Sequence, residues 1–221
     1  VTSQSGNVQI FHHVADGGSN DSTIAKLHDW NELVQTQRFP IIARNYNFSF
    51  SSEPDNGMYD AIVKGFNQFS LRPDDWMCWI NADDVFLPGA FALLGQASEA
   101  ADSKEISWLS GTAAIAAEDI SMLHTSRPVG SSVVKHGLCD GTHWEFIQSE
   151  GTFFKNKLWR QIDIQNDFRR FQYAGDWNLW RLFAQNHELF QTKHPLAVFS
   201  IRDGQLSSAN RSEYEAEIEA Q

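Results

Sequence analysis

The sequence is poor in basic residues and in cysteine, and it has no long hydrophobic run. Among its 221 residues, 17 Lys and Arg stand against 28 Asp and Glu, so the formal net charge is −11. A surface with this average charge repels a phosphate backbone, which disfavours general nucleic-acid binding. No apolar stretch approaches the roughly 20 residues that span a bilayer, so we expect a soluble chain.

Cysteine and several well-known motifs are also scarce or missing. Cys78 and Cys139 alone cannot build a disulfide framework or a four-cysteine zinc site, and a reducing compartment fits this usage best. There is no H-x-x-x-H or H-x-H pair, no G-x-S-x-G and no G-x-x-x-x-G-K-[ST]. A histidine-rich zinc site, a nucleophile-elbow hydrolase and a P-loop ATPase are therefore disfavoured.

What is present is an alternation of strands and helices in the first half of the chain. We expect strands at 8–15, 47–51 and 76–80, each followed by a helix, at 24–34, at 58–69 and after Pro88 and Gly89. Such alternation predicts a mostly parallel twisted sheet with helices on both faces. The second half is less regular, with candidate strands at 106–109, 132–135 and 196–201, a helix from Asp176 and a frayed terminal helix at 211–221.

Each of the first three strands runs into an acidic loop. These loops contain Asp16, then Glu53 and Asp55, then Asp83 and Asp84. Ligands of open parallel sheets bind outside the carboxyl ends of the strands. We therefore expect the three loops to share one edge of the sheet and to form a binding site there.

The adjacent carboxylates Asp83 and Asp84 are the first candidates for chemistry. After a buried strand such a pair is costly unless it is neutralised, and its hard oxygens suit Mg²⁺ or Mn²⁺. The alternative is that Asp83 caps the segment near Pro88 while Asp84 is solvated. Similar alternatives apply elsewhere: Asp16 fits an ordinary strand-to-helix turn, and Asp176 fits a helix cap as well as a general base.

Four blocks of the sequence resemble family 2 glycosyltransferases, especially bacterial members that build exopolysaccharide or lipopolysaccharide. They occur in the family's order and cover most of residues 8–184: HHVADGGSNDST, SFSSEPDNGMYDAIVKGF, WMCWINADDVFLPGAF and AGDWNLWRLF. The resemblance implies a GT-A fold and inverting transfer of a sugar from a nucleotide-diphosphate donor. It also implies a divalent cation, Mn²⁺ or Mg²⁺.

The resemblance also implies roles for individual acids. Asp16 matches the residue that meets the nucleotide base, Asp83 the one toward the ribose and Asp84 the metal ligand, with Asp83 and Asp84 together as the DXD-type pair. Asp176 matches the acid that deprotonates the acceptor hydroxyl. The remaining candidates are Glu53 and Asp55, in a donor-side loop, and Glu150, a lesser catalytic candidate in the acceptor-side run QSEGTFF.

The chain also departs from the family pattern. Members usually begin with one more strand, which is central in the sheet and carries part of the nucleotide pocket, so we expect a GT-A-like sheet without it. Val63 stands where the family has Asn. No Gln-x-x-Arg-Trp motif follows Asp176, which disfavours a processive synthase.

We therefore expect one domain over 1–221, with a nucleotide-sugar half to about residue 105 and an acceptor half beyond it. The expected enzyme is a hexosyltransferase of cell-surface polysaccharide synthesis. Its substrates would be a UDP- or GDP-sugar and a glycan or lipid-linked acceptor. It would be cytoplasmic, in contact with the inner membrane through other proteins. The alternatives are a sugar-nucleotide nucleotidyltransferase and a non-catalytic carbohydrate-binding module.

Overall fold

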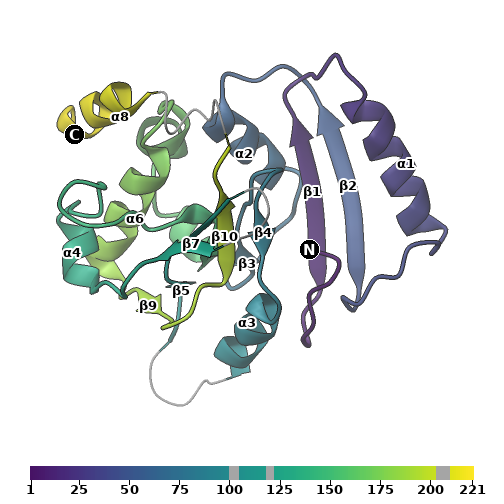
Figure 1. Ribbon diagram of the computed structural model, residues 1–221, viewed down its shortest axis with the longest axis horizontal. Coiled ribbons are helices and arrows are strands. Elements are labelled where there is room, and N and C mark those ends of the chain that lie inside the picture. The colour runs from purple at the N-terminus through teal and green to yellow at the C-terminus, as the bar shows by residue number, and fades with distance from the viewer. Residues whose placement is uncertain (100–104, 118–121, 203–209) are drawn as a thin grey trace.

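The computed structural model describes residues 1–99, 105–117, 122–202 and 210–221, which form a mixed α/β fold (Figure 1). The first elements are β1 (Ile10–Asp16), α1 (Thr23–Gln35), β2 (Tyr46–Ser52), α2 (Met58–Phe66), β3 (Trp76–Met77), β4 (Val85–Phe86) and α3 (Ala90–Glu99). β5 (Trp108–Ser110), β6 (Ala114–Ala116), β7 (Met122–Thr125), α4 (Ser131–Lys135), η1 (Ser149–Gly151), β8 (Thr152–Lys155) and α5 (Asn156–Trp159) come next. The last elements are η2 (Ile164–Arg169), α6 (Gly175–Asn186), β9 (Phe190–Gln191), β10 (Ala197–Ser200) and α8 (Arg211–Glu219). Within the described ranges, no helix has the length and apolar character needed to cross a bilayer.

β1 and β2 form a parallel pair, as the sequence predicted. The register runs from Ile10 opposite Tyr46 to Asp16 opposite Ser52, and the aromatic and branched side chains along both strands favour this extended backbone. α1 lies beside β2 and α2 beside β1 (Figure 1), so the helix between the two strands makes the crossover that a parallel pair requires. The carboxyl ends of both strands therefore meet at one edge, and the loops that follow them are neighbours.

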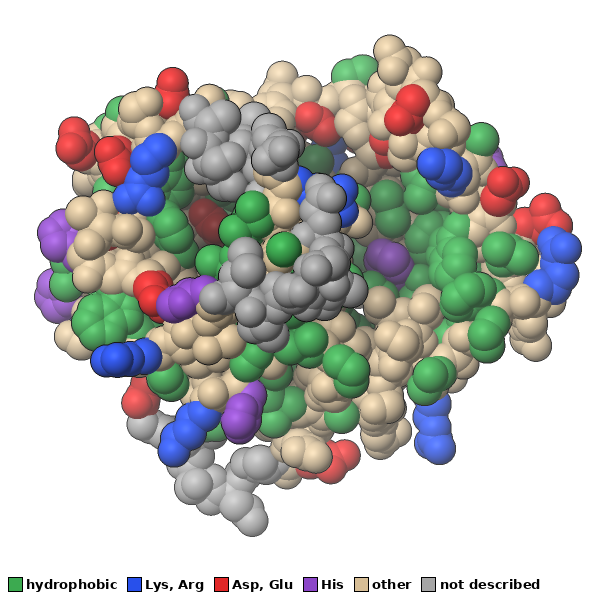
Figure 2. Space-filling model, viewed as in Figure 1, with side chains coloured by type: hydrophobic (Ala, Val, Ile, Leu, Met, Phe, Trp, Pro, Cys, Tyr) green, Lys and Arg blue, Asp and Glu red, His purple; other side chains and the backbone are tan. Residues whose placement is uncertain are grey.

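The other strands form two mixed sheets rather than one mostly parallel sheet. Their orders are β4-β10-β6-β7 and β3-β8-β5-β9, with β10–β6 and β5–β9 as the parallel pairs. The remaining pairs are antiparallel, and of these only β6 and β7 follow one another directly in the chain. Figure 2 shows this face of the molecule hollowed between the part that contains β1 and β2 and the part around β10.

Two predicted strands differ from the structure. In the apolar run 76–80 only Trp76 and Met77 form a strand, and β3 pairs antiparallel with β8. Residues 132–135 belong to the helix α4, although Val133 and Val134 are typical of strands. Val134 is buried against the core that contains α6, so tertiary packing decides the conformation there.

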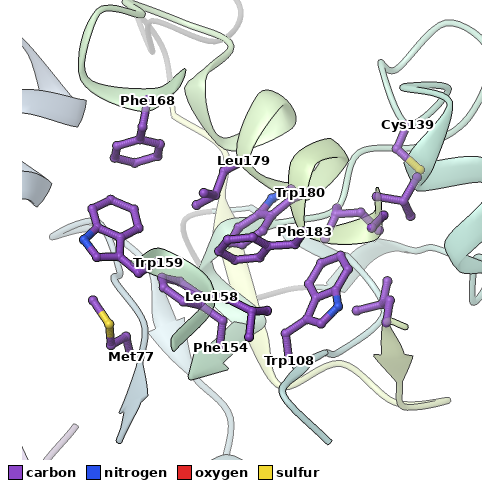
Figure 3. Close-up of a cluster of buried hydrophobic side chains, with 14 of the residues drawn as sticks. Met77, Trp108, Cys139, Phe154, Leu158, Trp159, Phe168, Leu179, Trp180 and Phe183 are labelled. Carbon is purple, nitrogen blue, oxygen red and sulfur yellow. The ribbon is translucent and has the colours of Figure 1, made fainter. Parts of the chain in front are cut away.

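The main core is built from aromatic side chains around α6 (Figure 3). Trp180 stacks on Trp79 with ring centroids 5.5 Å apart and on Trp108 at 6.0 Å. Most tryptophans therefore fill the interior, as expected, whereas Trp144 is 43% exposed. A second cluster, which includes Ile10 of β1, joins this strand to α3, β5 and β8. The core thus supports both the edge formed by β1 and β2 and the start of α6.

Candidate functional site

Asp16 ends β1, and its carboxylate is held by its own loop and by β2. Its Oδ2 accepts hydrogen bonds from the backbone N–H groups of Gly18, at 3.0 Å, and Ser19, at 2.9 Å. The hydroxyls of Ser19 and Ser52 donate to it as well. These bonds lower the pKa of Asp16 to about 2, and the bond from the Ser19 hydroxyl contributes most. The geometry is that of the strand-to-helix turn, with an anion fixed at the strand end.

The loop after β2 lies directly against the loop after β1. A Cβ on Gly17 would stand 2.6 Å from Asp55 Oδ2, so the two loops approach this closely because position 17 has no side chain. Glu53 is exposed, and its carboxylate lies 3.9 Å from Lys64 Nζ. We call Asp16 and Asp55 the rim acids; the backbone N–H of Glu53 donates to the carbonyl oxygen of Asp16 at 3.0 Å, whereas its carboxylate lies near Lys64.

Asp83 and Asp84 have different surroundings although they are adjacent in the chain. Asp84 is 9% exposed, and it accepts hydrogen bonds from the backbone N–H of Ser200, at 2.8 Å, and from Asn81 Nδ2, at 3.1 Å. Burial raises the pKa of Asp84. Asp83 is less buried, and its carboxylate lies 3.8 Å from the Nε of Arg202. Of the pair, Asp84 is the residue that faces the interior.

Glu150 lies in η1, next to Asp84. The amide Nδ2 of Asn81 donates to Glu150 Oε1 at 3.0 Å as well as to Asp84, so one side chain bridges the two carboxylates. Glu150 is 4% exposed, and burial, followed by the charge of Asp84, raises its pKa to about 8. Like charges in such a place cannot both ionise readily, so burial and the charge of Asp84 disfavour the ionised form of Glu150.

Asp176 lies in the first turn of α6, where the sequence predicted a helix start. The backbone N–H of Trp177 donates to its Oδ1 at 2.8 Å, and the hydroxyl of Tyr59, at 3.0 Å from the same atom, is shared with the carbonyl oxygen of Tyr173. Burial outweighs these bonds and raises the pKa of Asp176 to about 6. A carboxylate with this pKa is ionised at neutral pH and can take up a proton.

Tyr59 connects the two parts of the site. It begins α2, just after the loop of Asp55, and its ring packs against the start of α6. A Cβ on Gly175 would come within 3.0 Å of that ring, so glycine permits the close approach. The charge of Asp176 also contributes to the raised pKa of Glu150, which places these carboxylates within electrostatic reach of each other.

We call Asp84, Glu150 and Asp176 the interior acids. They come from segments far apart in the sequence: Asn81 links Asp84 to Glu150, and Tyr59 links Asp176 to the start of α2, which follows the rim loops. The sequence predicted one shared edge for all the loops; the structure places the two rim loops together and sets Asp84 among the interior acids instead. The roles assigned to Asp16, Glu53, Asp55 and Asp83 stay predictions.

A pocket opens beside Asp176. Its cavity volume is about 10 Å³, room for one water-sized group such as a single hydroxyl, and its wall combines this carboxylate with side chains of α4, α6, α8 and the segment 139–147. Phe146 and Tyr214 are among them. The lining residues are mostly apolar, and Asp176 and Tyr214 contribute a carboxylate and a hydroxyl to it.

Asp84 and Glu150 are the buried carboxylates that could hold a divalent cation. Within the described residues, no three or more His, Cys, Asp or Glu side chains form a group that could hold a metal ion. Mg²⁺, however, needs only one or two carboxylates and completes its shell with water and substrate phosphates. The mutual repulsion of two buried carboxylates, visible in the pKa of Glu150, is what such an ion would relieve.

Sequence reasoning missed several partners of these acids. Asn81 stands two positions before Asp83 in the quoted block, so its position was a usable signal. Tyr59 lies in the quoted block SFSSEPDNGMYDAIVKGF, but its bond to Asp176 joins residues 117 positions apart, which no local pattern indicates. Tyr214 lies in a terminal acidic segment in which no pattern marks it.

The comparisons with known proteins give no related protein whose site could be compared with this one. A scan against protein-family models finds no match to the chain, and a search of curated proteins finds none. The functional assignment therefore depends on the residues themselves and on the resemblance of the four sequence blocks.

Proposed function

We propose that the protein is an inverting, metal-dependent glycosyltransferase. It would transfer a hexosyl group from a nucleotide-diphosphate sugar to a hydroxyl of a glycan or lipid-linked acceptor. The observation that supports this best is the arrangement of the interior acids. A buried pair suited to a cation, Asp84 and Glu150, lies within electrostatic reach of Asp176, a carboxylate that can act as a base in a pocket.

The donor side of the site would lie at the ends of β1 and β2 and directly before β4. Asp16, ionised at any physiological pH, accepts hydrogen bonds and would meet the base; Asp83 would meet the ribose. Glu53 and Asp55 would border the donor. Asp84 would hold the divalent cation, which supplies positive charge to the diphosphate leaving group.

On the acceptor side, Asp176 removes the proton of the attacking hydroxyl. The acceptor oxygen forms a bond to the anomeric carbon, the bond from that carbon to the diphosphate oxygen breaks, and the proton passes to Asp176. Tyr59, 3.0 Å from Asp176 Oδ1, holds the carboxylate in place. Because the pKa of Asp176 is about 6, the carboxylate is mostly ionised at neutral pH and is still basic enough to accept a proton.

The family and the GT-A fold are part of this proposal, as is the biological setting. A donor of the UDP or GDP class and an acceptor in cell-surface polysaccharide synthesis, at the cytoplasmic face of a bacterial inner membrane, fit the resemblance of the four blocks. A single domain with a donor half to about residue 105 and an acceptor half beyond it is part of the same proposal.

The decisive experiment is calorimetry with UDP, GDP and CDP, each with and without Mn²⁺. We expect one nucleotide to bind in a Mn²⁺-dependent manner and Asp84→Asn to abolish this binding. The amide introduced by this substitution would still accept the hydrogen bond from Ser200, so the fold should persist. Asp29→Asn, on an exposed face of α1, is the matched control and should bind as the wild type does.

The other outcomes identify the competing functions. Binding of a nucleoside triphosphate together with a sugar phosphate would instead indicate a nucleotidyltransferase. Saccharide binding without any nucleotide affinity would indicate a carbohydrate-binding module. Failure of every nucleotide to bind would contradict the proposed transferase.

A further inference from the structure

The hydroxyl of Tyr214 is buried and has no hydrogen-bond partner within the described residues. Tyr214 belongs to α8 and lines the same pocket as Asp176. Burial raises the pKa of Tyr214, and the charge of Asp176 raises it further. The phenol therefore keeps its proton and remains a donor at any physiological pH. A donor without a partner and a carboxylate acceptor therefore share one small pocket.

Contacts of α8 with neighbouring segments hold Tyr214 in place. Glu217, one turn further along α8, accepts hydrogen bonds from the backbone N–H groups of residues 172–174, at 2.8, 3.0 and 2.8 Å. This segment leads directly into Asp176, so α8 is joined to the start of α6, which it adjoins in Figure 1. The ring of Tyr214 also meets Phe146 edge to face, with centroids 5.3 Å apart.

A buried hydroxyl without a partner destabilises the fold, and a phenylalanine would fill the same space without that cost. The unmade bond therefore points to a ligand that completes it. A ligand hydroxyl between the two groups can donate to Asp176 and accept from Tyr214 at the same time. Trp180, in the same wall, has an unpartnered Nε1, but Trp79 and Trp108 share that feature, so it does not set the pocket apart as Tyr214 does.

We propose that Tyr214 binds the acceptor saccharide, donating its phenolic proton in a hydrogen bond to the hydroxyl that Asp176 deprotonates. The ligand class is a sugar alcohol group at the end of a glycan, and α8 is the wall of its subsite. This inference rests on the proposed function and assigns to the terminal helix the recognition of the acceptor. As the acceptor oxygen attacks, its own proton passes to Asp176, while Tyr214 keeps its proton and orients the oxygen.

The test compares Tyr214→Phe with a matched control, Tyr46→Phe. The hydroxyl of Tyr46 lies 2.7 Å from His12 Nδ1, on β2 and away from the pocket, so this variant loses a real hydrogen bond. Binding of the methyl glycosides of glucose, galactose and N-acetylglucosamine is measured by saturation-transfer NMR, and thermal unfolding is recorded for each protein. Calorimetry with Mn²⁺ and UDP or GDP accompanies both measurements.

We expect Tyr214→Phe to weaken glycoside binding at least tenfold, to leave nucleotide binding unchanged and to leave the unfolding temperature unchanged or raised. Tyr46→Phe should lower the unfolding temperature and bind glycosides as the wild type does. The inference is overturned if no glycoside binds the wild type, if Tyr214→Phe binds as well as wild type, or if it is destabilised as much as Tyr46→Phe.

The outcomes also separate this inference from the proposed function. Glycoside binding that depends on Tyr214 without nucleotide binding would support the subsite and contradict the transferase. Mn²⁺-dependent nucleotide binding, together with glycoside binding that is the same in Tyr214→Phe and the wild type, would support the transferase and contradict the subsite.

Discussion

The rim acids and the interior acids are chemically alike but have opposite electrostatics. Asp16 is bonded by two backbone N–H groups and two hydroxyls, and its pKa is lowered to about 2. Burial raises the pKa of Asp176 to about 6 and, with the charge of Asp84, that of Glu150 to about 8. The rim therefore holds a permanent anion suited to binding, whereas the interior holds carboxylates that exchange protons or take a cation.

The difference shows that hydrogen-bond donors and solvent decide what a carboxylate can do. A carboxylate that accepts several hydrogen bonds in an open loop has a lowered pKa and does not bind a proton near neutral pH. A carboxylate with few donors in a buried place gains from a proton or a metal ion. Variants that exchange charge for a neutral amide should thus affect the two regions in different ways.

The largest effect is expected at the base. Asp176→Asn removes the proton acceptor while keeping the shape, so transfer should fall about 10²–10⁴-fold. Mn²⁺-dependent nucleotide binding, measured by calorimetry, should stay unchanged because that site uses other residues. The neutral control is Asp29→Asn, and transfer that persisted in Asp176→Asn would show that the interior acids do not include the base.

Glu150→Gln should weaken Mn²⁺ binding about 10–100-fold and stabilise the metal-free protein. The folded pKa of about 8 lies above the ordinary value of 4.5, so the folded state binds the proton more tightly. The ionised carboxylate therefore destabilises the fold progressively as the pH rises from 4.5 and fully above 8.

The measurement for Glu150→Gln is the unfolding temperature from about pH 5 to about pH 9, with a Mn²⁺ titration. The gain over the wild type should grow with pH, because glutamine still accepts the bond from Asn81 and carries no charge. If Glu150→Gln lowered the unfolding temperature equally at every pH, the charge of Glu150 would not be what destabilises the wild-type fold.

At the rim, Asp16→Asn should reduce nucleotide affinity about tenfold and lower the unfolding temperature by a few degrees. Since the folded pKa of about 2 lies below the ordinary 3.8, the carboxylate stabilises the fold above pH 3.8 and loses this effect as the pH falls through 2. Asp21→Asn removes the charge from a similar bond, in which the Thr23 N–H donates at 2.8 Å, and should spare nucleotide affinity. Equal nucleotide affinity in the two variants would contradict a binding role for the rim.

The smallest effect is expected from Tyr59→Phe. Its hydroxyl bond helps to lower the pKa of Asp176, so removing it should move the acid limb of the transfer rate upward by up to about one pH unit from its wild-type position near 6. The pH–rate profile is the measurement, and the rate at high pH should change little. An unmoved limb would show that Asp176 does not control the rate at acid pH.

Much of the local structure was predictable from residue patterns. Branched and aromatic runs indicated β1 and β2, helical spacing indicated α1, α2 and α6, and the turn at Asp16 was expected. The strand predicted at 132–135 is wrong, since α4 is a helix, and the run 76–80 is a strand only at its start. Both errors arise because short segments take the conformation that their packing partners allow.

The sequence by itself determined where the carboxylates stand along the chain and which strand or helix ends present them. Only the tertiary structure decided that Asp84 rather than Asp83 faces Glu150, that Tyr59 holds Asp176 and that α8 covers the pocket. The physical reason is that a pKa and a free hydrogen bond depend on burial and on partners brought together from distant segments. Asn81 and Glu150, for example, are separated by 69 positions and meet only in the folded chain.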